Sequence, residues 1–282
     1  MAARARRNGG LLTTFGDWAR KYPLAPRWRR EERLALRTLD GVPISAARLA
    51  GPADAPCTVV LVHGFLNSSR SPVVHAFARL LAERVHVIVP DLRGHGASGG
   101  SVTLGVLEPY DVAAAVEAAP EGLPVVTVGT SLGGVAVLRH AGLLGGVAGV
   151  VAISAPGWKD LDGREGARRL NRFVASRTGR QAAARLLRTR VGRLPPFTDM
   201  REAMASIAPA FTIIVHDPDD VYFGDEHAHS LYEWANEPKD LWLLPGTGHG
   251  GDLLTSHLAD RLFAKVLPRL PSGSFSPDPG RE

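Results

Sequence analysis

One serine of this sequence lies between two glycines in a pattern that suggests a catalytic role. Ser131 lies in Gly129-Thr130-Ser131-Leu132-Gly133, directly after a run of β-branched residues and directly before a helix-like pattern. A strand that feeds a helix through this pentapeptide is typical of a nucleophile elbow, a sharp turn that exposes the serine hydroxyl. The pentapeptide alone is a weak signal, and the strand–turn–helix context strengthens it.

A serine nucleophile needs a base, and the base needs an acid to orient it. His249 follows an apolar run and stands in a glycine-rich loop, whereas His227, His229 and His257 fall in helical patterns and are expected at the surface or in packing. An acid follows the apolar run 213–215, where three candidates stay open: Asp217, Asp219 and Asp220. His227-x-His229 lacks a third ligand, so we expect no metal site, and this chemistry requires no cofactor.

Apolar runs alternate with helical patterns along most of the chain. Residues 34–51 form a predicted hairpin around Asp40-Gly41, and short continuous apolar runs follow that suit strands buried on both faces. Such alternation predicts an α/β fold with a mostly parallel, doubly wound sheet. Residues 159–210 break the alternation, because they are rich in Arg, Ala and Leu and contain no convincing strand. They are predicted to form a helical cap inserted between core segments 34–158 and 211–268.

The order Ser131, aspartate, His249 resembles the α/β-hydrolase superfamily, and two further segments strengthen the resemblance. One is "LVHGFLNSS", in which His63-Gly64-Phe65 follows a strand. The other is "PDLRGHGASGG", which resembles an Asp-x-Arg-Gly-His-Gly-x-Ser segment of lipase-like and esterase-like members. The resemblance covers about residues 34–268. It is specific as a set of motifs and unspecific about the substrate.

The resemblance assigns roles to several residues. Family members often read His-Gly-x-x-Asp after the strand, which places the acid at Asp220, although Asp217 here replaces the glycine. The backbone N–H groups of Phe65 and Leu132 would form the oxyanion hole. His63 is expected to brace its loop and not to act as the base. Asp91, Arg93 and His95 are likewise expected to order a loop.

These roles imply a serine hydrolase that cleaves a carboxylic ester of a small-molecule acyl substrate through an acyl-enzyme. A thioesterase, lactonase, amidase or acyltransferase fits the same triad, and so does a ligand receptor without turnover. Trp158, just after a strand, is a candidate pocket residue. Apolar cap residues either line an acyl pocket or dock the cap: Leu186, Leu187 and Phe197.

The chain has 282 residues, 45% of them apolar, and a single cysteine, Cys57. No run is long enough to predict a transmembrane helix or a secretory signal, and the single cysteine excludes an internal disulfide, so a cytoplasmic location is expected. Nine basic and three acidic residues make residues 1–33 a basic arm, and residues 269–282 form a predicted flexible tail. Aromatic residues do not alternate with the arginines, so no nucleic-acid partner is expected. Contact of the arm with an anionic membrane surface is the less favoured alternative to a solvated arm.

Overall fold

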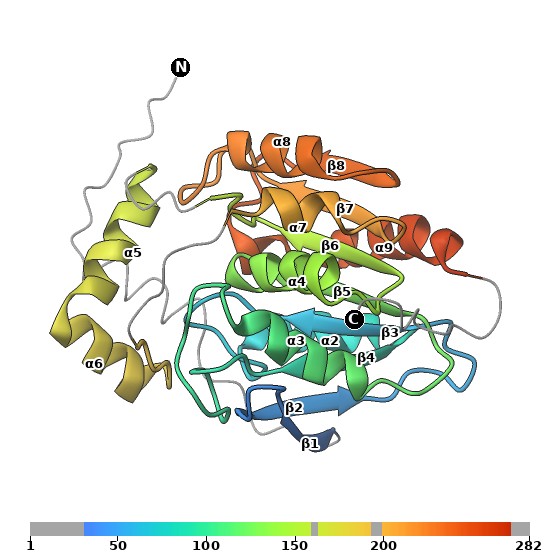
Figure 1. Ribbon diagram of the computed structural model, residues 1–282, viewed down its shortest axis with the longest axis horizontal. Helices are drawn as coiled ribbons and strands as arrows, with labels where there is room; N and C mark the ends of the chain where they lie inside the picture. Colours follow the sequence, from blue (N-terminus) through green and yellow to red (C-terminus); the bar gives the residue numbers. More distant parts are fainter. Residues whose placement is uncertain (1–30, 159–162, 193–198, 272–282) are drawn as a thin grey trace.

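The computed structural model describes residues 31–158, 163–192 and 199–271, which form one eight-stranded sheet with helices on both faces (Figure 1). The strand order is β1-β2-β4-β3-β5-β6-β7-β8. The strands are β1 (Glu32–Arg37), β2 (Pro43–Leu49), β3 (Thr58–Val62), β4 (His86–Pro90), β5 (Val125–Thr130), β6 (Gly149–Ile153), β7 (Phe211–His216) and β8 (Lys239–Leu243). All neighbours from β4 to β8 pair in parallel, so the predicted fold class is confirmed.

Continuous apolar sequences form the centre of the sheet. Every residue of β3, β5, β6 and β7 is buried, as expected for parallel strands that are covered on both faces. The helices of the core are α2 (Pro72–Leu81), α3 (Glu108–Glu117), α4 (Leu132–Leu143), α7 (Arg201–Ala205), α8 (Asp225–Trp234) and α9 (Ser256–Val266). Helices α2 and α9 pack into the apolar cluster on one face, and α3, α4, α7 and α8 pack into the cluster on the other.

The predicted hairpin forms the antiparallel edge of the sheet. Strands β1 and β2 pair from Glu32 with Arg48 to Arg37 with Pro43, and β2 continues antiparallel against β4. Gly41 has a φ of +82° in the connecting turn, a conformation that glycine adopts without steric cost. The first strand begins inside the segment predicted as the basic arm.

The predicted cap segment divides into two parts. Helices α5 (Glu165–Ala175) and α6 (Arg177–Leu186) lie beyond the carboxyl ends of the parallel strands, at the left of Figure 1. Helix α7 instead packs against α4, and its Met204 is fully buried in the core with Met200. The described part of 159–210 contributes no strand to the sheet, and residues from Met200 onward belong to the core packing.

Among the described ranges, no helix is both long and apolar enough to span a membrane. Cys57 is fully buried just before β3, and burial raises the pKa of its thiol to about 12, which suits a packing residue. Residues 1–30 of the predicted arm, Phe197 in the cap and the tail from residue 272 lie outside the described residues.

Candidate active site

Ser131 stands at the turn between β5 and α4 in a conformation that few serines adopt. Its φ is +52° and its ψ is −115°, so the backbone is held in a strained region. A Cβ built at Gly129 would lie 2.2 Å from the carbonyl oxygen of Gly133, and one built at Gly133 would lie 2.4 Å from that of Val62. The turn therefore requires both flanking glycines, and it places Ser131 at the N-terminus of α4.

An imidazole–carboxylate pair forms between two loops at the carboxyl edge of the sheet. His249 Nδ1 lies 2.6 Å from Asp220 Oδ2, and the Asp220 side chain is fully buried while that of His249 is 16% exposed. The other carboxylate oxygen, Oδ1, accepts the N–H groups of Tyr222 and Phe223 at 2.7 and 3.3 Å. Both oxygens of Asp220 are thus engaged, one by the imidazole and one by its own loop.

The two neighbouring aspartates are placed differently. Asp219 is exposed to solvent. Asp217 is buried, and its carboxylate accepts the N–H groups of Gly246 and Gly248 from the loop that carries His249, at 3.2 and 2.5 Å. Burial raises the pKa of Asp217, but these backbone hydrogen bonds outweigh it and keep the pKa below its ordinary value. Of the three predicted acid candidates, the structure brings Asp220 alone within hydrogen-bond distance of His249.

The loop of His249 is also anchored next to Ser131. Gly250 donates its N–H to Ser154 Oγ at 3.0 Å, and Ser154 has a φ of +52° at the end of β6. A Cβ built at Gly250 would lie 3.8 Å from Ser131 Cβ, so this loop runs beside the serine. Ser131 Oγ forms no hydrogen bond within the described residues. Such contacts often tighten only when substrate is bound.

The predicted oxyanion residues converge on the same point. A Cβ built at Gly64 would lie 3.3 Å from Ser131 Cβ, which brings the loop of Phe65 against the elbow. Leu132 is the first residue of α4, and the first N–H groups of a helix have no partner inside it. Within the described residues, the N–H groups of Phe65 and Leu132 donate to no protein acceptor.

Two buried histidines join the loop of Phe65 to the loop after β4. His63 Nε2 accepts the N–H of Leu92 at 3.1 Å, and its Nδ1 lies 2.8 Å from the carbonyl oxygen of Gly64. His95 Nε2 accepts the N–H of Leu66 at 3.3 Å. Burial lowers the pKa of both rings, and the acceptor role of each Nε2 requires a neutral ring. The geometry gives both rings the loop-bracing position that the sequence predicted.

The other residues of the predicted lipase-like segment order the loop after β4. Asp91 is fully buried and accepts the N–H groups of Ser69 and Ala97 at 2.7 and 3.0 Å. Arg93 is also buried, and it forms ion pairs with Asp111 of α3 and Asp40 of the hairpin turn, both at 2.7 Å. This segment therefore ties the hairpin and α3 to the edge that carries the candidate site.

The predicted pocket residues differ in their burial and in their contacts. Trp158 is half-buried and stacks on His227, with ring centroids 3.9 Å apart, and it also lies near Trp234. Leu186 is 58% exposed, whereas Leu187 is half-buried. A role of Trp158 or Leu187 in binding substrate stays a prediction.

The residues that hold Asp220 and His249 in place were not predicted from the sequence. Arg164, just before α5, donates from Nη1 to the carbonyl oxygens of Pro218 and Asp220 at 3.0 and 2.5 Å. Tyr222 packs on the His249 ring with centroids 4.5 Å apart. Arg164 lies 56 residues before Asp220, so only an assembled fold brings these groups together. The Tyr222-Phe223 pair, two and three residues after Asp220, is a local signal in the sequence.

Comparison with known proteins agrees with this architecture. Residues 59–275 match the model of the Alpha/beta hydrolase family. The chain belongs to this family. No curated protein matches it in sequence.

Several solved structures share the fold of this chain. The esterase Pf2001 of Pyrococcus furiosus has 21% sequence identity and a TM-score of 0.66 over 88% of this chain and 96% of its own. The esterase RhEst1 of Rhodococcus sp. ECU1013 has 22% identity and a TM-score of 0.62, over 83% of this chain and 99% of its own. XC6422 of Xanthomonas campestris, described as an α/β serine hydrolase without lid, has 20% identity and a TM-score of 0.58, over 89% and 99%.

Proposed function

We propose that this α/β hydrolase cleaves a carboxylic ester, with Ser131 as nucleophile, His249 as general base and Asp220 as the acid that orients it. The single observation that carries the proposal is the 2.6 Å contact between His249 Nδ1 and Asp220 Oδ2 beside the strained turn of Ser131. Family membership and the esterases that share the fold support hydrolase chemistry.

The proposed reaction has two halves. His249 Nε2 takes the proton of Ser131 as its oxygen attacks the ester carbonyl carbon, and the imidazolium then protonates the departing alcohol. In the second half His249 takes a proton from water as the water attacks the acyl carbon, and the imidazolium then returns this proton to the Ser131 oxygen as the ester bond breaks and the acid is released. Asp220 holds the tautomer with the proton on Nδ1 and stabilises the imidazolium.

The oxyanion of each tetrahedral intermediate would be bound by the N–H groups of Phe65 and Leu132. These groups have no protein acceptor within the described residues, so they are available to a ligand without breaking a bond. Removing one such donor in comparable enzymes costs about 10²–10³ in kcat. The N-terminus of α4 adds a positive potential at the same point.

The experiment is the hydrolysis of p-nitrophenyl esters from acetate to decanoate by the full-length protein and by two serine variants. Ser131→Ala should lower kcat by about 10⁴–10⁶ with an unchanged melting temperature. Ser256→Ala, at an exposed position at the start of α9, should retain full activity. Retention of more than about a tenth of the wild-type rate by Ser131→Ala would remove the nucleophile assignment. The chain-length series would give the acyl preference.

A further inference from the structure

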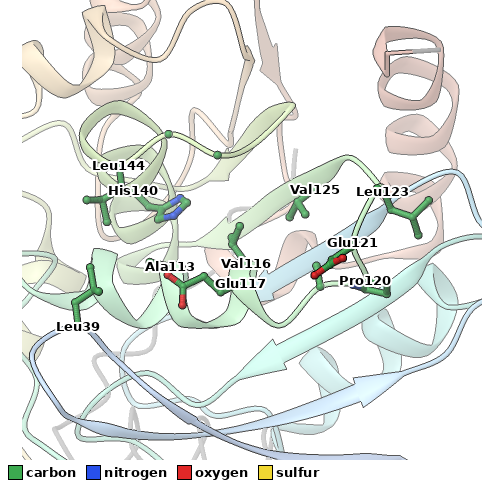
Figure 2. A pocket seen from close by; sticks show the side chains of 14 residues that line it. Leu39, Ala113, Val116, Glu117, Pro120, Glu121, Leu123, Val125, His140 and Leu144 are labelled. Atoms are coloured by element: carbon green, nitrogen blue, oxygen red, sulfur yellow. The ribbon is translucent and has the colours of Figure 1, made fainter. Parts of the chain in front are cut away.

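A second hollow lies away from the candidate active site, between the C-terminal ends of α3 and α4. It has a volume of about 580 Å³, within the range of pockets that hold small molecules. Figure 2 shows its walls: Leu39 of the hairpin turn, Val116 and Glu117 of α3, Glu121 of the following loop, His140 of α4, and Leu144 just after α4. Val125, at the opposite end of β5 from the elbow, also lines it, so it lies roughly 20 Å from Ser131.

The walls of this hollow, which we call the α3–α4 pocket, are mainly apolar and unusually exposed. Leu39 is 73% exposed and Leu144 is 39% exposed, although large apolar side chains gain by leaving water. Leu143, next to Leu144, is 46% exposed as well. An apolar ligand body in the α3–α4 pocket would cover part of this surface.

The charge around the α3–α4 pocket has one sign. Glu117 and Glu121 line it, and neither forms an ion pair within the described residues. Within the described residues, no lining residue is Lys or Arg. Arg48 reaches this region, donating to the carbonyl oxygen of Ala118, and it is already paired with Glu32 at 3.1 Å.

Two helix C-termini also lie at the α3–α4 pocket, and Arg48 donates to the carbonyl oxygen of Ala118 at the end of α3. Helix α3 ends at Glu117 and α4 ends at Leu143, and the residues that follow both ends line the pocket. A helix C-terminus carries a partial negative charge, which a basic residue in the last turn usually offsets. The last turn of α3 has no basic residue, and that of α4 has only His140.

His140 cannot supply the offsetting charge. The side chain is 2% exposed, and burial lowers the pKa of its imidazole to about 4, so the ring is neutral near pH 7. Its Nδ1 is buried without a hydrogen-bond partner within the described part of the chain. In Figure 2 the ring projects from α4 toward α3 and Val116, into the space between the helices. A neutral imidazole has one acceptor nitrogen, and a ligand ammonium is a donor that would match it.

From these features we propose that the α3–α4 pocket binds a small organic cation, an ammonium group attached to an apolar body. The apolar body would lie against Leu39, Val116 and Leu144, and the ammonium would lie among Glu117, Glu121 and the two helix ends. Helix α4 connects this site to Ser131, since it begins after the serine and ends at the pocket.

The test is a titration of the full-length protein at pH 7 with each of three ligands of matched size, in which isothermal calorimetry measures the binding. The ligands are 3-phenylpropylamine, 3-phenyl-1-propanol and 3-phenylpropionate, which share the apolar body and differ in charge. The proposal predicts one amine bound per chain, weaker binding of the alcohol and weakest binding of the carboxylate. Equal binding of amine and alcohol, or no binding of the amine, would overturn it.

Variants locate the binding site independently of any enzymatic activity. Glu117→Gln combined with Glu121→Gln should raise the Kd of the amine about threefold or more, and this effect should shrink in 0.5 M salt. Leu144→Lys, which adds a cation at the rim, should abolish amine binding. The matched control is Glu83→Gln, an exposed glutamate outside the pocket, which should leave the Kd unchanged. If the Glu117/Glu121 and Leu144 variants bind the amine as the wild type does, the amine binds elsewhere and the proposal is wrong.

Discussion

Ser131 and Ser154 both adopt a φ of +52°, and both lie at carboxyl ends of neighbouring central strands. This backbone conformation is unfavourable for serine, so the surrounding packing must hold both residues in it. The strained conformation of Ser131 lets α4 begin at the next residue. Ser154 anchors the loop that follows His249 by accepting the N–H of Gly250. The candidate site and the strained backbone thus lie at the same edge of the sheet.

The three aspartates after β7 allow a sharp comparison at the level of single residues. Asp220→Asn should lower kcat for an aryl ester by about 10⁴, because the amide would favour the wrong imidazole tautomer. Asp219→Asn should leave kcat within about twofold, since Asp219 is exposed and a turn accepts Asn nearly as well as Asp. The measurement is kcat near neutral pH for both variants, with melting temperatures as a folding control. The opposite ranking would move the acid to Asp219.

Single residues of the site were predictable to different degrees. Ser131, His249 and Asp220 follow strands in short motifs, so local sequence identifies them as candidates. The position of Asp217 was not predictable, because its partners Gly246 and Gly248 lie 29 and 31 residues further along the chain. Nothing in the local sequence indicates that the Asp217 carboxylate accepts hydrogen bonds from a loop so far along the chain.

At the scale of elements, the turn from β5 to α4 depends on how closely three backbones approach. A side chain at position 133 would meet the carbonyl oxygens of Val62 and His63 at 2.4 and 2.6 Å. Both belong to backbone that leads into the loop of Phe65. Close packing of α4 on β3 therefore sets the distance between the two predicted oxyanion donors.

Gly133→Ala tests this element directly. The added methyl group should force α4 away from β3 and cost about 1–3 kcal/mol of unfolding free energy, with a fall in kcat as well. The control is Gly157→Ala, where the nearest atom, Trp234 Cζ3, lies 3.3 Å from the new Cβ. Chemical denaturation and aryl ester kinetics measure the two effects. If Gly133→Ala unfolds and reacts like the wild type, the packing account of the elbow is incorrect.

Elements of the core were easier to predict from sequence than those of the cap. The hairpin and the buried strands follow from Asp40-Gly41 and from continuous β-branched runs, which few other structures accommodate. The sequence places residues 201–205 in the predicted cap, whereas Met204 of α7 packs in the core. Apolar residues at helical spacing show that a helix has a buried face, and they do not specify which neighbour covers it.

At the scale of the whole molecule, an ion-pair network links the antiparallel edge to the site. Arg93 is 2% exposed and joins Asp40 in the hairpin turn to Asp111 in α3. The hydrogen bond from Arg93 lowers the pKa of Asp40 to about 2, although burial opposes it. An unfolded aspartate has a pKa of about 3.9, so this pair stabilises the fold above that pH and loses its contribution as the pH falls toward 2.

Asp40→Asn should therefore destabilise the protein in a pH-dependent way. At pH 6 the loss should be about 1–2 kcal/mol, reduced from the full linkage value because Asp40 is 32% exposed. The difference from the wild type should narrow between pH 4 and pH 3. Urea denaturation across this range measures it, with Asp54→Asn, an exposed position, as the control. A difference that stays constant with pH would mean that the charge of Asp40 does not act on stability.

Active-site labelling would identify the nucleophile, which we propose is Ser131. The full-length protein would be treated with a fluorophosphonate, digested with trypsin, and its peptides fragmented by mass spectrometry. We expect one adduct, on Ser131 in the peptide 94–139, and loss of labelling in the Asp220→Asn and Ser131→Ala variants. An adduct on another residue, or ester turnover that persists in fully labelled protein without an adduct on Ser131, would contradict it.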